Sequence, residues 1–139
     1  MKLIYIQYVR SILEQSCVVW HSSLTEENSI DLERVQKCAV RIILRKPYTN
    51  YEEALKSLNM ESLKERREKL CKKFALNCVR NDKMKNIFPI QEKKHNMKLR
   101  NEETFKVNFA NTERSKKSSI INMQKQLNTI IQNRKRNIG

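Results

Sequence analysis

Glycine and proline are almost absent from this chain, and their scarcity is the strongest constraint on its fold. Gly139 is the only glycine, and there are two prolines among 139 residues. A sheet-rich protein needs such residues in its many tight turns, so the sequence favours helices. The length suits one ordinary domain, and 39% hydrophobic against 32% charged residues predicts a modest core. We therefore expect an all-α fold, a small bundle of about four to five helices.

Helical spacing of apolar residues predicts where the helices lie. Residues 2–20 carry a stripe wide enough for a central helix. Its members are Ile4, Tyr5, Tyr8, Val9, Ile12, Leu13, Val19 and Trp20. Further helices are expected over 26–45 and 63–80, with a short helix before the latter and a last one over 119–133. The predicted divisions are a bundle at 1–90, a basic linker at 91–118, and a C-terminal helix with a frayed tail at 119–139.

Polar residues in front of three predicted helices suit the capping position. Thr25 precedes the helix over 26–45 and can accept a hydrogen bond from a backbone N–H of its first turn. Two capping boxes follow in the sequence, Thr49 with Glu52 and Ser62 with Glu65. These residues predict where the second, third and fourth helices begin.

The predicted helix over 63–80 has two distinct faces. At 100° per residue, one face gathers apolar side chains and the opposite face gathers basic ones. The apolar members are Leu63, Leu70, Cys71, Phe74, Ala75 and Cys78, and the basic members are Arg66, Lys69, Lys72, Lys73 and Arg80. Arg67 falls inside the apolar face, and a buried guanidinium needs a partner. We expect Arg67 to pair with Glu14 or Glu33, or to extend past Leu63 into solvent.

The net charge of +14 is unevenly distributed along the chain. Residues 1–60 have a net charge of +1, whereas residues 61–139 have +13. Such asymmetry is typical of a chain with a polyanionic partner or a basic tail. For a polyanionic partner, nucleic acid is the first candidate and an acidic membrane surface the second. No apolar run reaches the roughly 18 residues of a membrane span, and the first residues do not form a signal peptide.

The basic face predicts a nucleic-acid interface with two parts. The first part is the five basic residues of the helix over 63–80, and the second is Lys93, Lys94, Lys98 and Arg100 in the linker. The alternative is that these side chains are simply solvated, because Lys and Arg are common on exposed helix faces. Phe105 and Phe109 suit base stacking or, equally, docking of the tail onto the bundle.

Other function classes find little support in the residues. Cys17, Cys38, Cys71 and Cys78 form no CxxC pair and are interpreted as small core residues in a reducing compartment, so no metal is expected. Asp31 and Asp82 stand about fifty residues apart, and there is no glycine-rich phosphate loop. We expect no catalytic residue, no cofactor and no small-molecule ligand.

Four motifs together resemble one family. "YIQYVRSILEQSCVVWHSSLTEENSIDLERVQKCAVRII" is similar to the segment after the polymerase core in reverse transcriptases of non-LTR (LINE-type) retrotransposons. "YEEALKSLNMESLKERREKLCKKFALNC", "NDKMKNIFP" and "FKVNFANTERSKKSSIINMQKQLN" resemble the family's following segments, in the family's order. The likeness spans about residues 4–128. The sequence departs from the family at Gln15 and Ser115, where an aromatic is common, at Ile121, where proline is common, and at Gln126, where the family has an apolar residue.

The resemblance implies a thumb and post-thumb region, which holds the template–primer duplex behind a polymerase active site. The fingers and palm, with their catalytic aspartates, have no counterpart in this sequence. We therefore expect a non-catalytic remnant of a retrotransposon reverse transcriptase, either a 5′-truncated element or a fragmentary gene model, that binds nucleic acid without sequence preference. The missing polymerase core would be its ancestral packing partner. The alternative is a helical protein-interaction module that has no nucleic-acid role.

Overall fold

The computed structural model describes residues 1–90 and 105–136, so Lys93, Lys94, Lys98 and Arg100 lie outside the described residues. Within these two ranges the fold is all-α, as predicted, and no sheet is formed. The chain divides into two compact units, Met1–Leu70 and Cys71–Gly139, and each unit is described by itself. Among the described residues, no helix is both long and apolar enough to cross a membrane.

The predicted helix over 2–20 is interrupted. Helical turns α1 (Lys2–Ile4), the π-helical η1 (Tyr5–Arg10) and α2 (Ser11–Glu14) follow one another without a break. Gln15 then leaves the helical region with ψ 126°, and Ser16 adopts a left-handed φ of 51°. The short α3 (Cys17–Trp20) and the 3-10 turn η2 (His21–Ser23) complete the segment. Apolar spacing misses this break because the pattern resumes after it.

The segment over residues 2–20 was also expected to form a central helix, and this expectation is wrong. Tyr5 and Cys17 are its buried residues, at 4% and 3% exposure. The other stripe positions that stand in solvent with exposures of half or more are Ile4, Tyr8, Ile12 and Val19. Only a small part of the predicted apolar stripe is therefore buried in the core. The rest forms an exposed apolar surface.

Helix α4 (Glu26–Leu44) agrees with the predicted helix over 26–45. Thr25 caps it, because its hydroxyl oxygen accepts a hydrogen bond from Asn28 N at 3.2 Å. The cap of α5 (Tyr51–Ser57) was predicted wrongly. Asn50, not Thr49, accepts the backbone bond there, from Glu53 N at 2.8 Å. Thr49 instead donates to the Glu53 carboxylate, so the two polar neighbours divide the roles of capping and side-chain contact.

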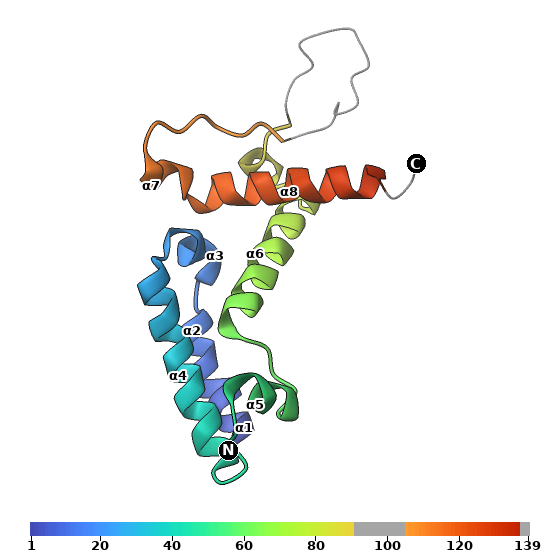
Figure 1. Ribbon diagram of the computed structural model, residues 1–139. Helices are drawn as coiled ribbons and strands as arrows, with labels where there is room; N and C mark the ends of the chain where they lie inside the picture. The colour runs from blue at the N-terminus through green and yellow to red at the C-terminus, as the bar shows by residue number, and fades with distance from the viewer. Residues whose placement is uncertain (91–104, 137–139) are drawn as a thin grey trace, which may run out of the picture. The chain divides into compact units, whose positions relative to one another are not determined.

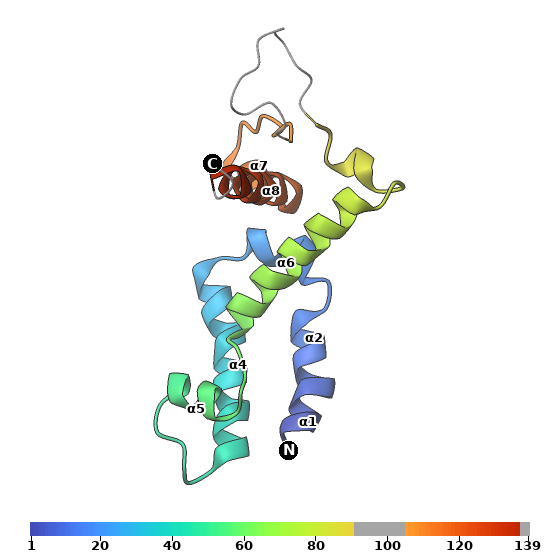
Figure 2. The same cartoon turned by 90° about the vertical axis from the view of Figure 1, so that its right-hand side faces the viewer.

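Helix α6 (Leu63–Arg80) has the predicted bounds and begins at the predicted cap. The Ser62 hydroxyl oxygen accepts from Glu65 N at 3.2 Å. In the first unit, α5 packs against α4 (Figures 1 and 2). The buried side chains of this core are Tyr5, Val40, Ala54, Leu55 and Met60. The core is small, in keeping with the polar composition.

The predicted apolar face of α6 is confirmed at Leu63, Cys71, Ala75 and Cys78, which are buried. The cysteine prediction fails at one position. Cys38 is exposed, and all four cysteines are free thiols. Burial raises the pKa of the Cys78 thiol, as expected for a cysteine that serves as a small core residue.

The second unit contains the rest of α6, the 3-10 turn η3 (Lys85–Ile87), α7 (Glu113–Lys116) and α8 (Ser119–Arg136). Helix α7 falls within the segment predicted as linker. Its cap, Thr112, accepts from Ser115 N at 3.2 Å. In α8, Ile121, Met123 and Leu127 are buried, whereas Ile120 is 47% exposed.

Phe105 is a structural residue of the second unit. It packs edge-on against Phe88 with ring centroids 6.3 Å apart. Its backbone N donates to Asn128 Oδ1 at 2.7 Å, and its backbone O accepts from Asn128 Nδ2 at 3.0 Å. Of the two uses open to the tail aromatics, docking therefore holds for Phe105. Phe109, by contrast, is 92% exposed.

Candidate nucleic-acid interface

The basic residues of α6 belong to both units, and their surroundings differ. Arg66 and Lys69 lie in the first unit and are engaged by carboxylates of the same unit. Lys72, Lys73 and Arg80 lie in the second unit and are exposed. The sequence pattern alone could not separate these two groups, because the partners of the first group are distant in the chain.

Arg66 makes a two-pronged ion pair with Glu14 of α2. Its Nε donates to Oε1 at 2.5 Å and its Nη2 to Oε2 at 3.0 Å. The hydrogen bond to Glu14 raises the pKa of Arg66 further above its already high ordinary value. Such a paired guanidinium is a poor phosphate ligand, because binding a phosphate would first require separating it from Glu14.

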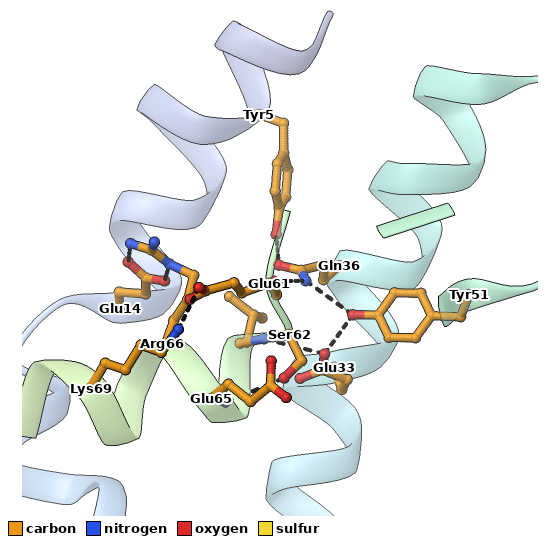
Figure 3. A network of polar contacts seen from close by, with 11 residues as sticks. Tyr5, Glu14, Glu33, Gln36, Tyr51, Glu61, Ser62, Glu65, Arg66 and Lys69 are labelled. Atoms are coloured by element: carbon orange, nitrogen blue, oxygen red, sulfur yellow. Dashed lines mark hydrogen bonds and ion pairs between the residues drawn. The ribbon is translucent and has the colours of Figure 1, made fainter. Parts of the chain in front are cut away.

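Lys69 is paired in a similar way. Its ammonium donates to the carboxylate of Glu61, and this hydrogen bond lowers the pKa of the Glu61 carboxyl (Figure 3). Both groups are largely exposed, so the pair contributes little to stability but does neutralise the lysine locally.

The three basic residues of the second unit have no such neutralisation. Among residues 1–90 and 105–136, no carboxylate forms an ion pair with Lys72, Lys73 or Arg80. Residues 71–139 carry seventeen Lys and Arg and five Asp and Glu, a net charge of +12, against +2 for residues 1–70. The positive field of the chain therefore comes mainly from the second unit, and these three residues are its described part on α6.

Arg67 has neither of its predicted environments. Its side chain is 0% exposed, so it does not extend into solvent. Its Nη2 donates to Ser29 Oγ at 3.2 Å, and its guanidinium carbon lies 5.9 Å from the centre of the Trp20 ring. Both predicted carboxylate partners are occupied elsewhere, Glu14 by Arg66 and Glu33 by an unforeseen polar network.

That network joins three elements of the first unit (Figure 3). Tyr5 OH donates to Gln36 Oε1 at 2.8 Å, and Gln36 Nε2 donates to Tyr51 OH at 3.0 Å and to the backbone oxygen of Glu61 at 2.9 Å. Tyr51 in turn donates to Glu33. Gln36 is 0% exposed, so these bonds satisfy an amide that would otherwise be costly to bury.

Burial raises the pKa of both tyrosines of this network. Desolvation raises the pKa of Tyr5 to about 12, and desolvation together with the hydrogen bond to Glu33 raises the pKa of Tyr51 strongly. Both phenols therefore remain neutral donors over the physiological range. The one sequence signal for this network was Gln36 itself, a polar residue at an inward position of α4.

The described residues do not form a metal-binding site. Among the described residues, no three His, Cys, Asp or Glu side chains lie close enough together to hold a metal ion. Asp31 accepts from Arg34 at 2.7 Å on the exposed surface of α4, which is a local helix pair. What the described residues offer chemically is charge and apolar surface.

Comparisons with protein-family models, with curated proteins and with solved structures found no match to this chain.

Proposed function

We propose that this chain is a non-catalytic nucleic-acid-binding segment related to the thumb region of LINE-type reverse transcriptases. The observation that supports binding is the exposure of Lys72, Lys73 and Arg80, without carboxylate partners among the described residues, in a unit of net charge +12. Unpaired surface cations displace the counterions condensed on nucleic acid, which is the main source of sequence-independent affinity. The proposed kinship rests on the four motifs and their order.

The chemistry of the three residues suits phosphate rather than base recognition. Lys72 and Lys73 are flexible point charges, and Arg80 can place two parallel N–H groups on one phosphate. Phosphate contacts position a protein on the duplex but carry no sequence information. Arg66 and Lys69 should contribute less than their neighbours, because each is already held by a glutamate.

A salt titration tests the proposal. The full chain is added to two fluorescein-labelled 20-base-pair duplexes of unrelated sequence, and anisotropy is followed from 50 to 200 mM KCl. The two duplexes should bind equally. Changing Lys72, Lys73 and Arg80 together to Gln should reduce the slope of log K against log salt by about 2.7, at roughly 0.9 per phosphate contact. Helicity should be kept, because Gln has a comparable helix propensity.

The matched control removes the same charge from the first unit. Lys37, Lys46 and Lys56 are all exposed, and their joint change to Gln should alter the slope by less than about one unit. Equal effects of the two triple variants would show that only net charge matters, and would overturn the proposed interface. An unchanged slope in the α6 variant would also reject it and favour the basic stretch around Lys93.

Absence of polymerase activity is a separate part of the proposal. Two-metal nucleotidyl transfer requires carboxylates that hold both ions about 4 Å apart. Purified chain in a primer-extension assay with Mg²⁺ should extend no primer. Template-dependent synthesis that is lost when Asp31 or Asp82 is changed to Asn would overturn this assignment.

A second candidate function is a protein-interaction module, and one observation favours it. Leu3, Ile4, Tyr8 and Ile12 are between 57% and 71% exposed on the first helical segment. Exposed apolar side chains grouped in this way are typical of a surface that docks another protein. Apolar docking should be insensitive to salt, and Ile4→Ser with Ile12→Ser should weaken it while leaving the nucleic-acid slope unchanged.

A further inference from the structure

A cavity of about 550 Å³ opens in the first unit. Its walls come from α4, α5, the first turn of α6 and the segment that joins α5 to α6. Glu33, Tyr51, Glu61, Ser62 and Glu65, which line it, are seen together in Figure 3. We refer to this feature as the acidic cavity.

The acidic cavity has an apolar wall and a negative lining. Ile30, Tyr51, Leu55 and Met60 supply the apolar part, and Ile30 is 50% exposed. Five glutamates and two lysines line it, so its local charge is opposite to that of the chain as a whole. A cavity of this composition excludes phosphate and attracts a cation that carries an apolar stem.

Two of the five glutamates already have ion-pair partners within the unit. Glu61 is held by Lys69, and Glu26 lies 3.9 Å from the Lys64 ammonium. Among the described residues, neither Glu52 nor Glu65 has an ion-pair partner. These two carboxylates are exposed and available to a ligand.

Glu33 gives a second, independent reason to expect a ligand that carries hydrogen-bond donors. Its Oε1 accepts from Tyr51 OH and from Leu63 N, the latter at 3.2 Å. Its Oε2 is buried and, within the part of the chain that the structure describes, accepts no hydrogen bond. An unsatisfied buried carboxylate oxygen costs free energy, so an N–H donor that reached it after a local side-chain rearrangement would be stabilising.

The residues that line the acidic cavity indicate the chemical class of its ligand. Among the described residues, no three His, Cys, Asp or Glu side chains lie close enough together to hold a metal ion, which favours an organic cation. A lysine or arginine side chain has an aliphatic stem for the apolar wall and N–H donors for the glutamates. We propose that the acidic cavity binds a lysine or arginine side chain of a basic amphipathic peptide from a partner protein. Charge complementarity favours this occupant, and the volume is sufficient for such side chains.

The test uses the full chain and a defined probe. The probe is a fluorescein-labelled 12-residue peptide that alternates Leu with Arg, and its matched partner has Gln in place of every Arg. Anisotropy is measured at 150 mM KCl, where the Debye length of about 8 Å limits long-range attraction between charges. The Arg peptide should bind, and the Gln peptide should bind at least about tenfold more weakly.

Paired variants locate the site. Glu52→Gln with Glu65→Gln should weaken binding of the Arg peptide about fivefold or more. The control is Glu27→Gln with Glu53→Gln, which removes the same charge from comparable first-turn positions of α4 and α5 outside the cavity. This control should leave binding within about twofold. Ile30→Ser, at a half-exposed position of the wall, should also weaken binding without unfolding the chain.

Several results would overturn the proposal. Equal losses in the cavity and control variants would indicate general electrostatic attraction, and equal binding of the Gln peptide would indicate an apolar site without a cation. Self-association of the chain that is abolished by the Glu52 and Glu65 changes would make a second copy the occupant. The nucleic-acid slope serves as an independent readout, since the cavity variants should leave it unchanged whether or not the peptide binds.

Discussion

Arg67 and Ser29 form a hydrogen bond of 3.2 Å between a fully buried guanidinium and a neutral hydroxyl. Nε and Nη1 of Arg67 have no hydrogen-bond partner among the described residues. Arginine cannot shed its proton in a protein, so this charge is buried without an ion-pair partner among the described residues. The adjacent Arg66 has the opposite situation, with two bonds to Glu14. Two neighbouring arginines of one helix therefore make contrasting contributions to stability.

This contrast predicts opposite effects of one substitution. Arg67→Met should leave the free energy of unfolding unchanged or raise it by about 1 kcal/mol, because the gain from removing a buried charge offsets the contact with Trp20. Arg66→Met should lower it by about 1–2 kcal/mol, because Glu14 would lose its partner. Urea unfolding followed by circular dichroism measures both. A larger loss in Arg67→Met than in Arg66→Met would show that the buried guanidinium is favourably placed.

His21 should make the stability of the first unit sensitive to mild acid. Burial, and then the positive charge of Arg67, lowers the pKa of His21 below 6.5. The folded state consequently binds this proton less readily than the unfolded state does. The stability that His21 contributes is fully present above pH 6.5 and is lost as the pH falls towards the folded pKa. The loss between pH 7 and pH 5 should be smaller in His21→Gln, as measured by urea unfolding.

The same histidine can report on Arg67 directly. An NMR titration of the His21 ring should give a higher pKa in Arg67→Met than in the unchanged chain. The recovery should be partial, because burial is the larger cause of the shift. A pKa of His21 that Arg67→Met leaves unchanged would mean that the two groups are not coupled.

The sequence predicted the long helices well because their signals are local. Helix α6 has the predicted bounds, since Ser62 marks its start and its apolar face continues to Cys78. The break at Gln15 and Ser16 was missed, because a single left-handed residue leaves the apolar spacing on either side intact. Local signals of this kind define where a helix runs but not which of its faces is covered.

The ion pairs of Arg66 and Lys69 could not be predicted from the sequence, because they depend on distant partners. Arg66 and Lys69 share a face with Lys72 in the sequence pattern, and that pattern does not distinguish them from Lys72. Their carboxylates come from residues 52 and 8 positions away, Glu14 and Glu61. Periodicity cannot detect such pairs, because it describes one helix at a time. The acidic cavity could not be predicted for the same reason, since α4, α5 and α6 all contribute residues to it.

Tyr5 should make stability depend on alkaline pH. Burial raises its pKa to about 12, above the ordinary value of 10, so the unfolded state loses this proton first. The stability that Tyr5 contributes is fully present below pH 10 and is lost as the pH rises from 10 to 12. Tyr5→Phe should lessen this alkaline loss. The control is Tyr8→Phe, since Tyr8 is 67% exposed and should behave like the unchanged chain. Equal alkaline loss in all three proteins would refute the assignment to Tyr5.

Arg45 ends α4 with a left-handed φ of 57° and ψ of −117°, a region that strains any residue with a Cβ atom. Arg45→Gly should raise the free energy of unfolding by about 0.5–1 kcal/mol, because relief of strain outweighs the added flexibility of the unfolded chain. Arg45→Ala keeps the strain and should have little effect, which separates backbone relief from loss of charge. Lys46 has no positive φ, so Lys46→Gly should lower stability by about 0.5–1 kcal/mol. Thermal and urea unfolding would measure all three, and a loss of stability in Arg45→Gly that matched the loss in Lys46→Gly would rule out strain at the end of α4.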